Sequence, residues 1–307
     1  MFNTSEEIVS FKELINLLLK RNIKKRIAIV WPEEKHTQEA VILAVKKGFI
    51  DPILICSQSV ANKFSTNNLF KCYVETDPVK AARKAVDLVR IGEAEAIMKG
   101  FVSTDILLKA ILDKENGILP KETVMTHITV AEIPNYKRLL VFTDSAVIPF
   151  PTDKQREQQI KYVVEICHKF QIKEPKISLI HCSEKVDKRH FPYTEHYVIL
   201  KEKCQKGEFG SCIIDGPLDL KTSCSLEALQ YKLIKSPING EANALIMPNI
   251  EAGNIFYKTI TLFSKAETAA ILQGPLVPII LTSRGDSITT KLNSLALATL
   301  ISDKHGI

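Results

Sequence analysis

The sequence lacks the patterns of several large protein classes. Its seven cysteines are odd in number and contain no Cys-x-x-Cys pair, which argues against a disulfide framework or a zinc site. No stretch approaches the roughly 18 to 20 apolar residues that a membrane span needs. The amino end is polar through Glu7, unlike a signal peptide. We therefore expect a cytoplasmic protein with free thiols and no membrane partner.

Long basic blocks and nucleotide-binding glycine loops are also missing. The run 20–26 is the one dense group of Lys and Arg, and it reads as the solvated end of a helix entering a strand. No Gly-x-Gly-x-x-Gly loop and no metal-ligating cluster is found. These absences predict no nucleic-acid partner, no metal and no bound cofactor. The net charge of +6 favours anionic substrates such as phosphate and nucleotides.

What the chain does contain is ordinary for a globular protein. It has 307 residues, of which 45% are hydrophobic and 25% are charged. A chain of this length is typical of two domains.

Short β-branched runs alternate with longer segments of helical period. The strand-like runs are 26–32, 51–56, 96–98, 139–142, 177–181, 211–214, 244–247 and 278–281. Helices are predicted over 37–47, from Asp77-Pro78 onward, and over 103–114, 153–170, 225–233 and 255–265. This alternation predicts an α/β fold with mostly parallel strands and helices on both faces.

Ligands of α/β sheets bind beyond the carboxyl ends of the strands, near helix N-termini. Five such corners carry polar residues: Lys99-Gly100 with Ser103-Thr104, Thr143-Asp144-Ser145, Asp215-Gly216-Pro217, 249–254, and Ser283-Arg284-Gly285. Helix capping alone would explain the Ser, Thr, Asp and Asn residues. It does not explain the cations and glycines that accompany them.

Four stretches together resemble the phosphate acetyl/butyryltransferase family. They are 142–152 (Phe-Thr-Asp-Ser-Ala-Val, then two prolines), Asp215-Gly216-Pro217-Leu218-Asp219, 242–258 and 274–294. The last contains Ser283-Arg284-Gly285-Asp286-Ser287 followed by Lys291-Leu292-Asn293-Ser294. The Met98-Lys99-Gly100 corner and this last pattern are closest to the butyryltransferase branch.

The resemblance implies two three-layer α/β/α lobes with mostly parallel sheets and a cleft between them, as in isocitrate and isopropylmalate dehydrogenases. Residues 1–148 plus 286–307 would form the first lobe. Residues 149–285 would form the second, carrying the Asn254/Lys258 and Ser283/Arg284 corners. The proline-dense stretch 148–152 is the expected crossing. A homodimer or larger homo-oligomer is implied as well.

The implied reaction moves a short acyl group, butyryl above others, between coenzyme A and inorganic phosphate. Acyl-CoA and phosphate are the partners, and coenzyme A thioester is a substrate with no cofactor bound. By resemblance, the catalytic group is Ser283, Arg284 and Asp286. The planar fork of Arg284 can hold two phosphate oxygens, while Gly285 permits close approach of the chain.

Further residues are expected to bind phosphate or coenzyme A. Lys99, Ser103 and Thr104 would form one wall, with Lys109 further along the same helix. Gly253 ends the 248–253 loop, after which Asn254 and Lys258 would share one face at a helix start. Thr143 and Asp144 fit either a structural hinge or a substrate contact equally well.

The general base stays unassigned. In the acetyltransferase branch an aspartate stands seven positions after the motif serine, and here that position is Thr290, which cannot act as a base. Asp286 is the nearest carboxylate, although it could instead cap the last helix. His127 is a weak candidate on a strand. The cysteines offer a covalent route, but direct transfer is preferred because none lies in a matched corner beside a histidine.

Four other functions stay open at this point. The chain could be a phosphate acetyltransferase, a non-catalytic relative that binds coenzyme A, a dehydrogenase of related fold, or an acyl-phosphate synthase that serves lipid synthesis.

Overall fold

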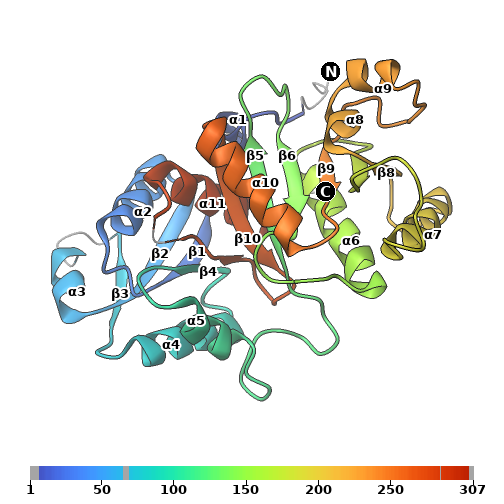
Figure 1. Cartoon of the computed structure of the whole chain (residues 1–307). Coiled ribbons are helices and arrows are strands. Elements are labelled where there is room, and N and C mark those ends of the chain that lie inside the picture. Colours follow the sequence, from blue (N-terminus) through green and yellow to red (C-terminus); the bar gives the residue numbers. More distant parts are fainter. Residues whose placement is uncertain (1–6, 65–68, 284, 304–307) are drawn as a thin grey trace. The chain divides into compact units, whose positions relative to one another are not determined.

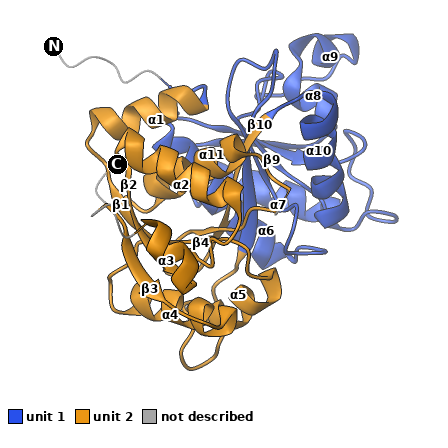
Figure 2. Ribbon diagram, turned by 90° about the vertical axis from the view of Figure 1, so that its left-hand side faces the viewer, with its two compact units in different colours: residues 1–10, 126–266, 307 blue, residues 11–125, 267–306 orange. Residues whose placement is uncertain are grey.

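The computed structural model describes residues 7–64, 69–283 and 285–303. Strands and helices alternate along the chain, and the strands pair mostly in parallel, which confirms the predicted α/β class (Figure 1). Two compact units emerge (Figure 2). Among the described residues, unit 1 holds 7–10 and 126–266, and unit 2 holds 11–125 and 267–303.

Unit 2 is built on strands in the order β3-β2-β1-β4-β11-β10. They are β1 (Lys25–Val30), β2 (Ile50–Cys56), β3 (Lys71–Val74), β4 (Ala96–Lys99), β10 (Glu267–Gln273) and β11 (Ile279–Ile280). All these neighbours pair in parallel except β10 and β11, which are antiparallel. The continuous apolar run of β1 is buried from Ile27 to Val30, as expected for a strand covered on both faces.

Helices of unit 2 flank these strands, with α2 and α11 on one side and α4 and α5 on the other (Figure 1). They are α1 (Phe11–Lys20), α2 (Lys35–Lys47), α3 (Gln58–Phe64), α4 (Pro78–Arg90), α5 (Thr104–Ile111) and α11 (Ile288–Ile301). The predicted start at Asp77-Pro78 is confirmed, since Asp77 accepts a hydrogen bond from Val79 N at 2.8 Å. Helix α11 is buried from Lys291 to Ile301 and packs against α1, α2 and β10.

Unit 1 has strands in the order β5-β6-β9-β7-β8. They are β5 (Thr126–Glu132), β6 (Leu140–Thr143), β7 (Lys176–Ile180), β8 (Ile213–Leu218) and β9 (Ala244–Ile246). Its helices are α6 (Asp153–Lys169), α7 (Tyr193–Gln205), α8 (Leu220–Cys224), α9 (Leu226–Tyr231) and α10 (Ile250–Phe263). Only β5 and β6 pair antiparallel among these strands.

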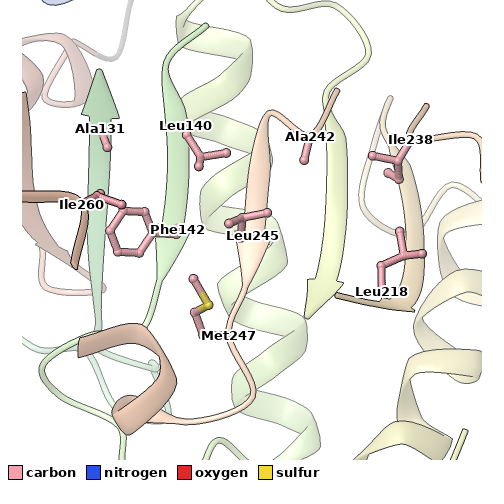
Figure 3. Close-up of a cluster of buried hydrophobic side chains, with 9 residues drawn as sticks. All are labelled: Ala131, Leu140, Phe142, Leu218, Ile238, Ala242, Leu245, Met247 and Ile260. Atoms are coloured by element: carbon pink, nitrogen blue, oxygen red, sulfur yellow. The ribbon is translucent and has the colours of Figure 1, made fainter. Parts of the chain in front are cut away.

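One hydrophobic cluster of unit 1 fixes α10 against its strands (Figure 3). Leu140 and Phe142 of β6, Leu245 of β9 and Ile260 of α10 are among its buried members. Phe256 of α10 meets the Phe142 ring edge-on, with ring centroids 5.0 Å apart. This packing holds the start of α10 beside the carboxyl end of β6.

Some elements differ from the sequence prediction. Asp215-Gly216-Pro217 is part of strand β8 and not a corner after it. Helix α10 begins at Ile250, five residues before the predicted start, because the side chain of Asn249 accepts a hydrogen bond from Ala252 N at 2.9 Å. Strands β3 and β10 are not predicted from the sequence at all.

The two units divide after Met125 and after Ala266, whereas the expected boundaries lie at 148/149 and 285/286. Strand pairing explains the difference. Val141 of β6 pairs with Ala244 of β9, which places 126–147 with the later strands. Ile280 of β11 pairs with Met98 of β4, which places 267–285 with the early strands. As a result Ser283 belongs to the same unit as Lys99.

Candidate active site

Three parallel strands of unit 2 end side by side. Val30 of β1 pairs with Lys99 of β4, and Ile280 of β11 pairs with Met98 of β4. The segments that follow these strands therefore meet at one carboxyl edge, where α/β folds bind ligands. Glu34 lies in the segment after β1, Gly100 begins the segment after β4, and Ser283 lies in the segment after β11.

The Lys99-Gly100 corner is tightly built. A Cβ atom on Gly100 would lie 2.5 Å from the main-chain oxygen of Trp31, so a larger residue does not fit there. The side chain of Lys99 is buried at 4% exposure, and its ammonium donates to the carbonyls of Gly100 at 3.2 Å and Val102 at 3.3 Å. A buried ammonium requires such acceptors. Lys99 thus stabilises the turn from β4 into α5.

Ser103 and Thr104 begin helix α5. The Ser103 hydroxyl accepts a hydrogen bond from Ile106 N at 3.4 Å and is the N-cap of the helix. Thr104 is the first helical residue and is exposed, as is Lys109. The capping interpretation therefore holds for Ser103, and both hydroxyl residues lie at a helix N-terminus on the carboxyl edge.

The loop 281–287, which joins β11 to α11, carries the predicted catalytic residues. Ser283 is exposed, and its N–H donates to the Asp286 carboxylate at 2.6 Å. In return, Asp286 N donates to Ser283 O at 3.2 Å. Arg284 lies outside the described residues. A Cβ atom on Gly285 would meet no protein atom within 4 Å, so protein packing does not demand glycine there.

Asp286 does not cap the last helix. That role belongs to Ser287, whose hydroxyl accepts a hydrogen bond from Thr290 N at 3.0 Å. The Asp286 carboxylate instead closes the turn over Ser283, as its hydrogen bond shows. Thr290 stands where the acetyltransferase branch has an aspartate. Its Oγ1 atom lies 3.1 Å from the Ser287 hydroxyl.

Two charged residues at this edge are missed by the sequence analysis. Lys291, in the first turn of α11, is 1% exposed and lies 3.3 Å from the carboxylate of Glu34. Glu34 is the N-cap of α2 and accepts a hydrogen bond from Thr37 N at 3.0 Å. The signals available were the position of Lys291 in the matched motif and that of Glu34 just after the predicted strand 26–32.

The Glu34 carboxylate is charged in a partly buried setting. Burial alone would raise its pKa. The hydrogen bonds from Thr37 and the positive charge of Lys291 outweigh that effect and hold the pKa of Glu34 below its ordinary value. Glu34 and Lys291 therefore form a charge pair at the carboxyl edge of unit 2.

In unit 1, Asp144 follows β6 and is 1% exposed. One oxygen of its carboxylate accepts from the Thr126 hydroxyl at 2.7 Å and His127 N at 2.9 Å. The other accepts from Ala146 N at 2.7 Å and Val147 N at 2.8 Å. Four hydrogen bonds occupy the lone pairs of a carboxylate, so the hinge interpretation fits Asp144 better than a substrate contact.

Thr143 shares this structural role. It is fully buried, and its hydroxyl lies 2.9 Å from that of Thr126. The peptide bond between Thr143 and Asp144 is cis.

The first turns of α10 lie against the segment after β6. Gly253 is buried in the helix and faces the Asp144 main chain. The Asn254 amide donates to Ser145 O at 3.0 Å. Lys258, one turn further along, is exposed. The structure therefore brings Asn254 to the Asp144-Ser145 segment, while Lys258 presents a cation on the surface of the same helix.

A buried polar group also lies beside this segment. The Ser145 hydroxyl is 3.0 Å from His127 Nδ1 and 3.4 Å from the Thr129 hydroxyl. Ser145 and His127 are 3% and 7% exposed. The sequence points to His127 alone, because its partner Ser145 stands 18 positions away and meets it only through the antiparallel β5–β6 ladder.

The described residues contain no group of three or more His, Cys, Asp or Glu side chains that could hold a metal ion. In the same residues, no helix combines the length and apolar character needed to cross a bilayer.

Comparison with known proteins identifies the chain's relatives. The family described as phosphate acetyl/butaryl transferase matches residues 72–299. The chain is 36% identical to the phosphate butyryltransferase of Clostridium acetobutylicum over 299 residues, covering 96% of this chain and 98% of that protein. It is 33% identical to the phosphate acetyltransferase of Thermotoga maritima over 284 residues, covering 91% and 96% respectively.

A solved structure agrees. The branched-chain phosphotransacylase of Enterococcus faecalis V583 matches 92% of this chain and all of that chain, with a TM-score of 0.79 and 29% identity. The resemblance drawn from the four sequence stretches is thereby confirmed. The chain belongs to the phosphate acetyl/butaryl transferase family and is a phosphate acyltransferase.

Proposed function

We propose that the chain transfers a short acyl group, butyryl in preference to acetyl, between coenzyme A and inorganic phosphate. Relatives named phosphate butyryltransferase from two Clostridium species, at 36% and 33% identity over 96% of the chain, support this specificity. The observation that carries the site is the carboxyl edge of unit 2, where the loop after β11 presents an exposed Ser283 beside the N-terminus of α11.

In this proposal, phosphate binds at the 281–287 loop. The Ser283 hydroxyl and the Arg284 guanidinium hold its oxygens, and the N–H groups at the start of α11 add partial positive charge. Gly285 leaves open space for the anion, since no protein atom would lie within 4 Å of an added Cβ. Lys99, Ser103 and Thr104 complete this end of the site from the β4–α5 corner.

The coenzyme A thioester is a substrate in this account, and no cofactor is bound. Asn254 and Lys258 are the proposed contacts for it, with the exposed ammonium of Lys258 suited to an anionic group of coenzyme A. Asp144 and Thr143 hold the segment on which Asn254 rests. Gly253 permits that close approach.

The proposed step is a direct transfer. A phosphate oxygen attacks the thioester carbonyl carbon, the carbon–sulfur bond breaks, and coenzyme A leaves as the thiolate while the acyl phosphate forms. Because phosphate is already nucleophilic, the site contributes mainly by holding two anions close together and by stabilising negative charge. No general base is needed to deprotonate the phosphate, so Thr290 in place of an aspartate is compatible with turnover.

The test is release of free thiol from acyl-CoA by purified protein. We expect release that requires phosphate and is fastest with butyryl-CoA in a series from acetyl to hexanoyl. Ser283→Ala and Arg284→Ala should raise the KM for phosphate without changing the fold. Equal or faster turnover of acetyl-CoA would favour the phosphate acetyltransferase alternative, which the 33% identical relative of that name supports. No phosphate-dependent release with any thioester would overturn the proposal.

Three finer expectations accompany this function. A homodimer or larger homo-oligomer and a cytoplasmic location stay predictions, and light scattering during size-exclusion chromatography tests the first. The two-lobed architecture like that of the isocitrate and isopropylmalate dehydrogenases also stays a prediction.

A further inference from the structure

Lys291, in the first turn of α11, is the one charged residue of that helix. Its side chain is 2% exposed, yet it carries a charge. The ammonium lies 3.3 Å from Glu34 Oε1, 3.4 Å from the Thr282 hydroxyl and 3.2 Å from the main-chain oxygen of Ser283. Two of these three acceptors belong to the loop 281–287.

The number of donors shows what Lys291 can do. A lysine ammonium has three N–H groups, and the three acceptors account for all of them. Binding phosphate directly would require Lys291 to give up one of these contacts inside a buried site. Lys291 is thus placed to hold Thr282 and Ser283.

Glu34 fixes the other end of this arrangement. It is the N-cap of α2, held by Thr37 N at 3.0 Å and by the Thr37 hydroxyl. It follows β1, whereas Ser283 follows β11, and these two strands lie on either side of β4. The pair thus ties the loop after β11 to a rigid helix start across the carboxyl edge of the sheet.

We infer that Glu34 and Lys291 form a positioning pair, which fixes the Ser283 main chain so that Ser283 is held ready to bind phosphate. The inference rests on the proposed function of that loop. Ser283 donates its N–H to Asp286 and its oxygen accepts from Lys291, so the peptide groups on both sides of this residue are held. Without the ammonium, the Ser283 oxygen and Thr282 hydroxyl lose their common donor.

The experiment compares three variants, Lys291→Met, Glu34→Gln and the double variant, by steady-state kinetics and thermal unfolding. For Lys291→Met we expect the KM for phosphate to rise about tenfold or more, with the KM for acyl-CoA within about twofold of wild type. Lys291→Met leaves the partly buried Glu34 charge without its partner, and Glu34→Gln does the same to the buried Lys291 charge, so both single variants should be less stable than wild type. The double variant removes both charges, so it should recover stability and keeps the test valid if Lys291→Met does not fold.

The KM of the double variant for phosphate distinguishes a positioning role from a purely stabilising role. A positioning role predicts that it stays raised although stability returns. A purely stabilising role predicts that it returns to the wild-type value together with stability, and that result overturns the inference. Lys25→Met is the matched control, because Lys25 forms ion pairs with Glu95 and Asp303 in the same unit, each at 3.4 Å, at the opposite end of β1. Its KM for phosphate should be unchanged.

Different results would disprove the proposed function and the positioning pair. If wild-type protein releases no thiol in response to phosphate, the proposed function is wrong. If wild type is active and the double variant saturates with phosphate at the wild-type concentration, only the positioning pair is wrong.

Discussion

Gly253 of α10 lies against the main chain of Asp144, so closely that a Cβ atom on it would be 2.1 Å from the Asp144 carbonyl oxygen. Its φ is not in the left-handed region, so glycine is needed here for space alone. The next residue, Asn254, donates its amide to Ser145 O at 3.0 Å. The close approach and this hydrogen bond together fix the first turns of α10 on the segment after β6.

Gly253→Ala should therefore separate α10 from that segment. The added methyl group meets main-chain atoms, which cannot rotate away, so we expect a loss of unfolding free energy of about 2 kcal/mol or more. Denaturant unfolding measures it. Gly285→Ala is the matched control, since a Cβ atom there meets nothing within 4 Å, and its midpoint should equal that of wild type. Equal stability of the two variants would contradict the packing described for α10.

Asp144→Asn tests whether the Asp144 carboxylate is structural. An amide presents only one acceptor oxygen, so its NH2 group would face two of the four donors that now reach the carboxylate. We expect destabilisation of about 2–5 kcal/mol, measured by urea or guanidinium unfolding. Asp51→Asn makes the same chemical change at an exposed ion pair with Lys24 and should cost below about 1 kcal/mol. A similar small cost at Asp144 would restore a substrate contact as its main role.

Ser103→Asp separates helix capping from anion binding. Aspartate is as good an N-cap as serine, so stability should change by less than about 0.5 kcal/mol. Its negative charge would repel an anion bound at the start of α5, and the KM for phosphate should then rise several-fold. Ser103→Ala is the complementary variant, expected to lose about 1 kcal/mol of stability through the missing cap. An unchanged KM in Ser103→Asp would limit Ser103 to capping.

The charge of Glu34 predicts a pH dependence of stability. Its pKa is lower in the folded chain than in the unfolded chain, so it contributes stability fully above about pH 5, and this is lost as the pH falls through the folded pKa. The difference in unfolding free energy between wild type and Glu34→Gln should be constant near neutral pH and shrink towards pH 3. Glu251→Gln, at an exposed position, controls for overall charge. A difference that does not shrink in acid would show that Glu34 acts through packing alone.

Much of the fold could be predicted because its signals are local. The buried run of β1 and the Asp77-Pro78 start of α4 are written in adjacent residues, and both are confirmed. Strand β3, with an exposed residue at each end and no fully buried residue, has no such signal. Proline is rare inside central strands, so Gly216-Pro217 indicates a corner, whereas strand β8 continues through both residues.

Neither the unit boundaries nor the Glu34–Lys291 pair can be predicted from residues that are adjacent in sequence. Which strands lie beside β4 and β6 is decided by pairing over long sequence separations, so the sequence does not show that Ser283 and Lys99 fall in the same compact unit. Lys291 looks like any polar residue near a helix start. Its positioning role is inferred from its burial and from its ion pair with Glu34, which is more than 250 residues away along the chain. The family motif contains both Ser283 and Lys291 but does not reveal the hydrogen bond between them.

The ³¹P NMR spectrum of wild-type protein with butyryl-CoA and phosphate, recorded alongside thiol release, shows whether the acyl group is transferred to phosphate. We expect butyryl phosphate to appear in a 1:1 ratio with free thiol, and neither product to form without phosphate. Thiol release that continues without phosphate, or that proceeds with no acyl phosphate formed, would contradict transfer to phosphate by this chain.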